Sequence, residues 1–167
     1  MSRANEFVDA NKSYASQFDG GNLPMPPARN VAVVACMDAR LDIYRMLGLG
    51  LGEAHVIRNA GGVVTEDVIR SLLISQRLLG TNEIVLVHHT DCGMLTFRDD
   101  DVRSDVESET GHRPAFALDS FSDPYADVQQ SIRRIQSVPF LPNTQSVSGF
   151  VYNVSTGELE PVSAEAA

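Results

Sequence analysis

Two segments that contain continuous apolar runs rich in β-branched residues stand out along the chain, at residues 31–36 and 83–89. Runs of this length are typical of parallel strands that are buried on both faces of a sheet. Another strand is expected between them, at residues 54–58. Residues 147–154 instead alternate around two aromatic side chains, which predicts a late edge strand, and the turn at residues 155–158 predicts a small hairpin.

Helical periodicity fills the longer intervals between these strands. Thr65 has the side chain of an N-cap and is followed by two acidic residues, so a helix is expected from there to Gly80. Asp123 and Pro124 form a similar start for a helix that ends before Pro139. Because strands and helices alternate, the connections are right-handed crossovers between parallel strands.

Two further segments have weaker patterns. Asp42 is a candidate N-cap for a short helix that ends at Gly48, and residues 98–122 predict a surface helix followed by a loop. The glycines at 48, 50 and 52 are expected to be turn residues. They follow a helix and precede a strand, which is the reverse of a dinucleotide-binding loop.

Residues 1–20 predict an N-terminal helical arm, because Phe7, Ala10, Tyr14 and Phe18 recur at helical spacing. A proline-rich connector, which cannot form regular helix, separates the arm from the first strand. The apolar face of this arm packs either on the core of its own chain or on a partner subunit.

These elements together predict an α/β fold with a mostly parallel open sheet flanked by helices. The expected strand order is about 2-1-3-4 plus a late edge strand. The length of 167 residues fits a single domain over residues 1–167, with residues 1–20 as the arm and residues 163–167 as a frayed tail.

Charge and composition narrow the class of protein. A formal net charge of −9 and a single lysine, Lys12, argue against a nucleic-acid interface, which needs clustered basic residues. No apolar run approaches the roughly 18 residues of a membrane span, and the polar N-terminal region does not suggest a signal peptide. We therefore expect a cytoplasmic protein that does not bind membranes.

The two cysteines of the chain lie at or just after the ends of these two runs. Cys36 ends the first run, His89 ends the second, and Cys92 follows three residues later. Thiolate and imidazole are ligands that zinc prefers, and open α/β sheets bind ligands at the carboxyl ends of their strands. The pattern predicts a catalytic zinc site. Two inert buried thiols are the alternative, whereas a structural disulfide is not expected in a reducing compartment.

Asp38 and Arg40 follow Cys36 at alternate positions. If the backbone stays extended there, the three side chains project to the same side and share one pocket. After the second strand, Gly61 and Gly62 are explained either by a tight turn or by a close approach of backbone N–H groups to a small bound oxyanion. The second explanation makes both glycines candidate substrate-binding residues.

Three motifs taken together resemble those of the β-class carbonic anhydrases, especially the short bacterial members, and the resemblance covers nearly the whole chain. The motifs are Cys36-x-Asp38-x-Arg40, His89-x-x-Cys92-Gly93 and Arg58-Asn59-Ala60-Gly61. The resemblance implies that Cys36, His89 and Cys92 bind one Zn²⁺ per subunit. Asp38 is then either a fourth ligand or the partner of Arg40, which leaves the fourth position to water.

The function that the resemblance implies is the reversible hydration of carbon dioxide to bicarbonate and a proton by a zinc-bound hydroxide. Asp38 and Arg40 are its catalytic residues, and the Gly61 N–H holds an oxygen of substrate or product. Because members of this family assemble as dimers or multiples of dimers, a homodimer or a dimer of dimers is implied here. The N-terminal helix is the candidate clasp.

Two other functions stay open at this point. Enzymes that hydrolyse carbonyl sulfide carry similar motifs, and a structural zinc module or thiol sensor would use the same ligands without turnover. Of the remaining histidines, His88 projects away from His89 and is expected to be structural, and His112 is expected in a surface loop. A pocket role for His55 is left open.

Overall fold

The computed structural model describes residues 2–163, so the predicted frayed tail, apart from Ser163, lies outside the described residues. Five strands and five α-helices are present in this part of the chain. The strands are β1 (Val31–Cys36), β2 (Ala54–Asn59), β3 (Glu83–His89), β4 (Val147–Tyr152) and β5 (Leu159–Val162). The helices are α1 (Arg3–Ala15), α2 (Ile43–Met46), α3 (Glu66–Leu79), α4 (Asp99–Thr110) and α5 (Pro124–Gln136).

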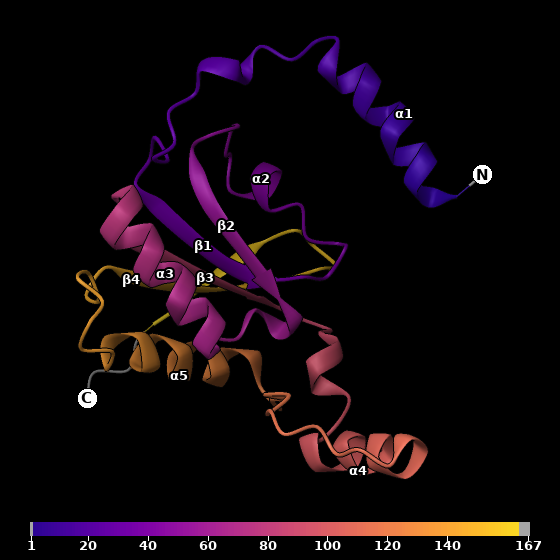
Figure 1. The fold of residues 1–167 in the computed structure, drawn as a ribbon. Helices are drawn as coiled ribbons and strands as arrows, with labels where there is room; N and C mark the ends of the chain where they lie inside the picture. The colour runs from indigo at the N-terminus through magenta and orange to yellow at the C-terminus, as the bar shows by residue number, and fades with distance from the viewer. Residues whose placement is uncertain (1, 164–167) are drawn as a thin grey trace.

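The strands form one sheet in the order β2-β1-β3-β4-β5 (Figure 1). The strands β2, β1, β3 and β4 are parallel, and β5 returns antiparallel to β4. This confirms the predicted α/β class and strand order. One detail differs: the segment expected to be the edge, β4, lies inside the sheet, because β5 covers its outer side as the second strand of the hairpin.

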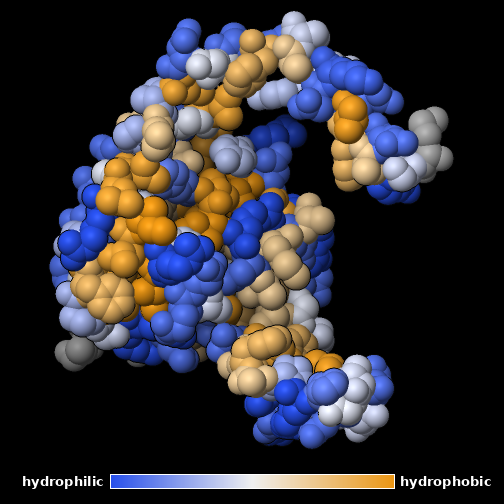
Figure 2. Space-filling model, in the orientation of Figure 1, coloured by the Kyte–Doolittle hydropathy of each residue, from blue (hydrophilic) through white to orange (hydrophobic). Residues whose placement is uncertain are grey.

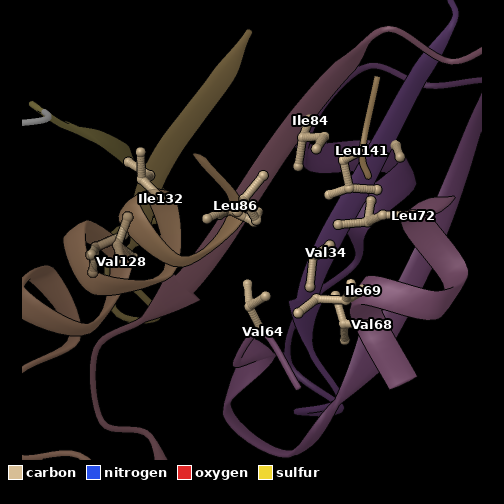
Figure 3. Packing of buried hydrophobic residues seen from close by; sticks show 13 residues of the cluster. Val34, Val64, Val68, Ile69, Leu72, Ile84, Leu86, Val128, Ile132 and Leu141 are labelled. Carbon is tan, nitrogen blue, oxygen red and sulfur yellow. The ribbon is translucent and has the colours of Figure 1, made fainter. Parts of the chain in front are cut away.

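Each face of the sheet has its own apolar core, because neighbouring residues of a strand point to opposite faces. Helices α3 and α5 cover one face, where Val34 of β1 and Leu86 of β3 are fully buried (Figure 3). The opposite face buries Val33 and Ala35 of β1. Cys36 and Cys92 belong to this second core. The predicted zinc ligands therefore lie on the face that α3 and α5 do not cover.

The predicted helix caps are present. The Thr65 hydroxyl accepts a hydrogen bond from the Val68 N–H at the start of α3, and Gly80 ends that helix with a φ of 75°. Asp123 caps α5 in the same way. These local signals explain why both long crossover helices begin and end where the sequence predicts. None of the helices within residues 2–163 has the length and apolar character needed to cross a membrane.

Helix α1 of the N-terminal arm does not pack on the body of its own chain. The connector before β1 forms an arch, helix α1 lies at its far end away from the sheet (Figure 1), and none of its residues is buried within the described chain. Phe7 is 69% exposed and Tyr14 is 57% exposed. The alternative that the arm packs on its own core is therefore wrong. Figure 2 shows that apolar side chains also gather on the body beneath this arch.

Candidate metal centre

The ends of β1 and β3 bring the three predicted ligands together. These strands are direct neighbours in the sheet, with Ala35 opposite Val87, so Cys36 and His89 lie at the same edge. Cys92 follows one turn later, just before the short 3₁₀ helix Gly93–Leu95. The two sulfur atoms are 4.0 Å apart, and one donor atom from each of the three residues lies within 4.8 Å of the others.

The chemistry of these donor atoms fits a metal ion. The Nδ1 atom of His89 is 2.9 Å from the carbonyl oxygen of Thr90, so Nδ1 carries the proton and Nε2 is left with its lone pair. Nε2 is buried and has no hydrogen-bond partner among residues 2–163. A buried nitrogen without a partner costs about 1–3 kcal/mol, a cost that a bound metal removes. Two thiols and this nitrogen form a donor set for a soft divalent metal.

The thiols of Cys36 and Cys92 shift the pKa of each other in opposite directions. The hydrogen bond from Cys92 lowers the pKa of Cys36, and the same contact raises the pKa of Cys92. Burial opposes ionisation of both sulfurs. The contact therefore favours ionisation of Cys36 over that of Cys92, and a metal ion bound by both sulfurs would release their protons.

Asp38 and Arg40 pair with each other beside these donor atoms. The Arg40 guanidinium donates to both carboxylate oxygens of Asp38, at 3.0 Å from Nε and 2.7 Å from Nη2. This contact holds the pKa of Asp38 well below its usual range. Asp38 Oδ2 also lies 3.8 Å from His89 Nε2. The structure thus shows Asp38 held by Arg40 next to the candidate metal position.

The prediction that the backbone stays extended after Cys36 is wrong. The chain turns instead: the Arg40 N–H donates to Asp38 Oδ1 at 2.8 Å and the Leu41 N–H donates to the Asp38 carbonyl at 3.1 Å. An aspartate commonly bonds to the backbone two residues onward in this way. The predicted grouping of Cys36, Asp38 and Arg40 is nevertheless present, because the turn brings the pair back to the strand end.

Two residues without an individual role in the sequence analysis also shape this site. Arg58 on β2 donates to the carbonyl oxygens of Cys36 and Asp38, at 2.9 and 2.7 Å, and so fixes the turn. Asp91 accepts a hydrogen bond from Arg40 Nη1 at 2.7 Å. Arg58 stands in one of the quoted motifs, which was the only signal for it. No spacing along the chain connects Asp91 with Arg40, so nothing in the sequence pointed to their contact.

A mostly apolar cleft of about 520 Å³ opens onto the candidate metal position. Asp38 and Gly61 line it together with both cysteines. The rest of its lining consists of Met37, Ala60, Gly93, Met94, Thr96 and Phe97. Gly62 does not line this cleft. A side chain on Gly62 would place its Cβ 2.8 Å from the Cys36 nitrogen, so this glycine allows close packing against β1, and its substrate contact stays a prediction.

The other histidines lie away from the cleft. His88 points to the opposite face of the sheet, as predicted, with its Nε2 at 2.7 Å from Asp127 Oδ2. His55 bonds through Nδ1 to the Ser75 hydroxyl at 2.7 Å, so it faces α3 and not the cleft of its own chain. His112 is exposed in the loop after α4, as predicted.

Comparison with known proteins identifies the family. The sequence profile of the carbonic anhydrase family matches residues 31–159. Over 162 residues, the chain is 59% identical to β-carbonic anhydrase 1 of Mycobacterium tuberculosis, covering 97% of this chain and 99% of that protein. The chain belongs to the β-carbonic anhydrase family. The resemblance seen in the three sequence motifs is thereby confirmed.

The fold of the chain matches that of solved family members over nearly its whole length. The crystal structure of the carbonic anhydrase from Streptococcus mutans superimposes with a TM-score of 0.92 at 40% identity, covering 98% of this chain and 99% of that one. A more distant relative, the carbon disulfide hydrolase of Acidithiobacillus thiooxidans, is 32% identical over 157 residues, or 82% of this chain and 79% of that protein. The chain therefore shares its fold with an enzyme named for a different small substrate.

Proposed function

We propose that this protein is a zinc-dependent carbonic anhydrase that reversibly hydrates carbon dioxide to bicarbonate and a proton. One observation supports this most directly. The buried, unpartnered Nε2 of His89 lies within 4.8 Å of the sulfurs of two cysteines that line an apolar cleft, and a carboxylate held by an arginine lies beside them. A structural zinc site would instead be closed by a fourth committed ligand.

Cys36, His89 and Cys92 would hold one Zn²⁺ per subunit. Two thiolates and a neutral imidazole balance the charge of the dication, so a fourth protein ligand is not needed for neutrality. Zinc in such a site lowers the pKa of the water that it binds and so supplies a nucleophile near neutral pH. Arg58, through its bonds to the carbonyls of Cys36 and Asp38, keeps the first thiol in place.

Asp38 and Arg40 act as catalytic residues beside the metal. With its carboxylate turned toward Arg40, Asp38 would not act as a fourth ligand and could accept a hydrogen bond from the attacking water, which would orient that water. The competing role of Asp38, as a fourth ligand, would close the site. The contacts of 2.7 and 3.0 Å with Arg40 favour the open arrangement.

The apolar cleft suits a small linear substrate without charge. Met37, Met94 and Phe97 offer apolar surface to carbon dioxide. The Gly61 N–H would donate to an oxygen of the bicarbonate product, and Gly62 would place that turn against β1. Gly61 reaches this position because its φ of 78° lies in the left-handed region.

Metal analysis combined with stopped-flow hydration of carbon dioxide tests the proposal. We expect about one zinc per chain in the wild type, and loss of both zinc and activity in Cys92→Ser.

Asp38→Ala separates an enzyme from a sensor or structural module. Retention of zinc with a large loss of activity supports catalysis, whereas zinc binding with full activity after that change would contradict the role of Asp38. A wild type that holds zinc without hydrating carbon dioxide would be a structural site or sensor.

A second candidate function is hydrolysis of a sulfur analogue such as carbonyl sulfide. The relatives named carbon disulfide hydrolase favour testing this, because they match more than three quarters of this chain. Both reactions begin with attack of an activated water on the central carbon of a linear molecule. Sulfide release that outpaces hydration of carbon dioxide in parallel assays would reverse our ranking.

We further propose that the chain works as a single domain and assembles as a homodimer or a dimer of dimers. The support is the arm at residues 1–20, whose apolar side chains are exposed within the described chain. A second copy of this chain would bury them. The two free thiols suit a reducing compartment, which agrees with the expected cytoplasmic location.

A further inference from the structure

Arg40 joins two turns that belong to different strands. Its guanidinium makes four hydrogen bonds, two to the carboxylate of Asp38 and two to Asp91. Asp38 follows β1, and Asp91 lies between His89 and Cys92 after β3. Arg40 therefore connects the turn that carries Asp38 to the turn that carries two of the proposed ligands.

The backbone of Asp91 adopts the conformation that this contact needs. Its φ is 55°, in the left-handed region, which aspartate tolerates better than most residues. In this conformation Asp91 accepts twice from Arg40, through Oδ2 at 2.7 Å and through its carbonyl oxygen at 2.9 Å. Two acceptors on one residue fix the orientation of a planar guanidinium and do more than supply a charge.

Asp38 has a second position within reach. Its Oδ2 lies 3.8 Å from His89 Nε2, so a small rotation of the side chain would bring it among the metal-binding atoms. Contact with Arg40 opposes that rotation. An arginine anchored to Asp38 alone could follow its carboxylate, whereas an arginine also anchored to Asp91 cannot.

We propose that Asp91 is a positioning residue, which orients Arg40 so that Asp38 stays turned away from the metal position. This inference rests on the proposed function. The opposite effect, in which the Asp91 charge draws Arg40 away from Asp38, is weaker. The Asp91 side chain is 78% exposed and its charge is screened by solvent, whereas that of Asp38 is 19% exposed. Asp91 thus contributes orientation, and Asp38 keeps the stronger ion pair.

Cobalt(II) in place of zinc gives a readout other than activity, because its visible absorption reports the ligands that it holds. Asp91→Gly removes the carboxylate without straining the left-handed backbone. We expect its cobalt spectrum to shift toward a site closed by Asp38 and to respond less to added thiocyanate. A smaller fraction of the molecules would then have Asp38 turned away from the metal position. The kcat for carbon dioxide should therefore fall, on the order of tenfold, with KM nearly unchanged.

Two further variants make this test specific. Asp91→Asn keeps an acceptor oxygen and tolerates the same backbone, so it should restore most of the wild-type spectrum and kcat. Asp119→Gly is the matched control, because Asp119 also has a positive φ, of 58°, but does not line the cleft. If Asp91→Gly has the same cobalt spectrum, thiocyanate response and kcat as the wild type, Asp91 is not a positioning residue. If the wild type does not hydrate carbon dioxide, the proposed function fails, and the spectra still decide the role of Asp91.

Discussion

Gly62 lies against the backbones of both strands that carry the proposed ligands. A Cβ at this position would be 2.8 Å from the Cys36 nitrogen and 3.1 Å from the Val87 carbonyl oxygen. Its φ of 73° would also strain any side chain. The sequence offered a tight turn as one reason for this glycine, and the structure adds close packing against β1 and β3 as the specific cause.

We predict that Gly62→Ala destabilises the fold by about 2–4 kcal/mol, from the left-handed backbone and the overpacking together. Urea denaturation monitored by circular dichroism measures this loss. Gly93→Ala is the matched control, because its Cβ would meet no atom within 4 Å, and it should change the free energy of unfolding far less. Equal stability of the two variants would contradict the packing role of Gly62.

At the scale of elements, α4 fastens the loop that leads to α5. Asp99 in the first turn of α4 accepts hydrogen bonds from the backbone N–H groups of residues 118–120, at 2.8 to 3.0 Å. The next residue is Phe121, whose ring centroid lies 5.3 Å from that of His88. The sequence predicted a surface helix and a loop here but not their contact, because the bonded residues are about twenty positions apart.

The Asp99 anchor predicts a pH-dependent contribution to stability. Burial alone would raise the pKa of this carboxyl, but the hydrogen bonds from Ser120 and its neighbours outweigh burial and lower the pKa to about 2. A depressed pKa means that the stabilisation is fully present above the pKa of the unfolded chain, near 4, and is lost as the pH falls through about 2.

We therefore expect Asp99→Asn to lower the free energy of unfolding by about 1–3 kcal/mol at pH 6. The difference in the free energy of unfolding between this variant and the wild type should decrease by roughly half near pH 3. Urea titrations at several pH values measure both quantities. Asp100→Asn, which alters an exposed neighbour, should cost much less. A difference that stays constant from pH 6 to pH 3 would show that the Asp99 charge is not responsible.

At the scale of the whole molecule, the arm is the part that the single chain leaves without a partner surface. Phe7, Tyr14 and Phe18 of the N-terminal segment are all exposed, and the ring centroids of Tyr14 and Phe18 are 5.5 Å apart. Apolar side chains gathered in this way on a projecting helix are typical of an interface. The proposed dimer accounts for both the exposure and the arched shape of the arm (Figure 1).

We predict that Phe7→Ser combined with Tyr14→Ser shifts the protein from dimer to monomer at micromolar concentration, because the interface loses its apolar anchors. Sedimentation velocity measures this shift. Asn11→Ser, on the same helix, should leave the assembly unchanged. A monomeric wild type, or a dimer that survives the double substitution, would exclude the arm as the clasp.

The sequence by itself determined the order of elements, their caps and the strand ends that carry Cys36 and His89. Those features follow from local rules, namely buried parallel strands that are apolar throughout and helices that begin at capping side chains. The resemblance to a known family supplied the ligand set and the choice between Asp38 as ligand and as partner of Arg40.

Only the tertiary structure decided how these residues meet. It replaced the expected extended segment after Cys36 with a turn, and it brought Arg58 of β2 and Asp91, which follows β3, to that turn. It also left the arm without contacts to its own core. The physical reason is that side-chain contacts between residues 20 to 51 positions apart depend on strand neighbours and register, and no local pattern in the chain encodes them.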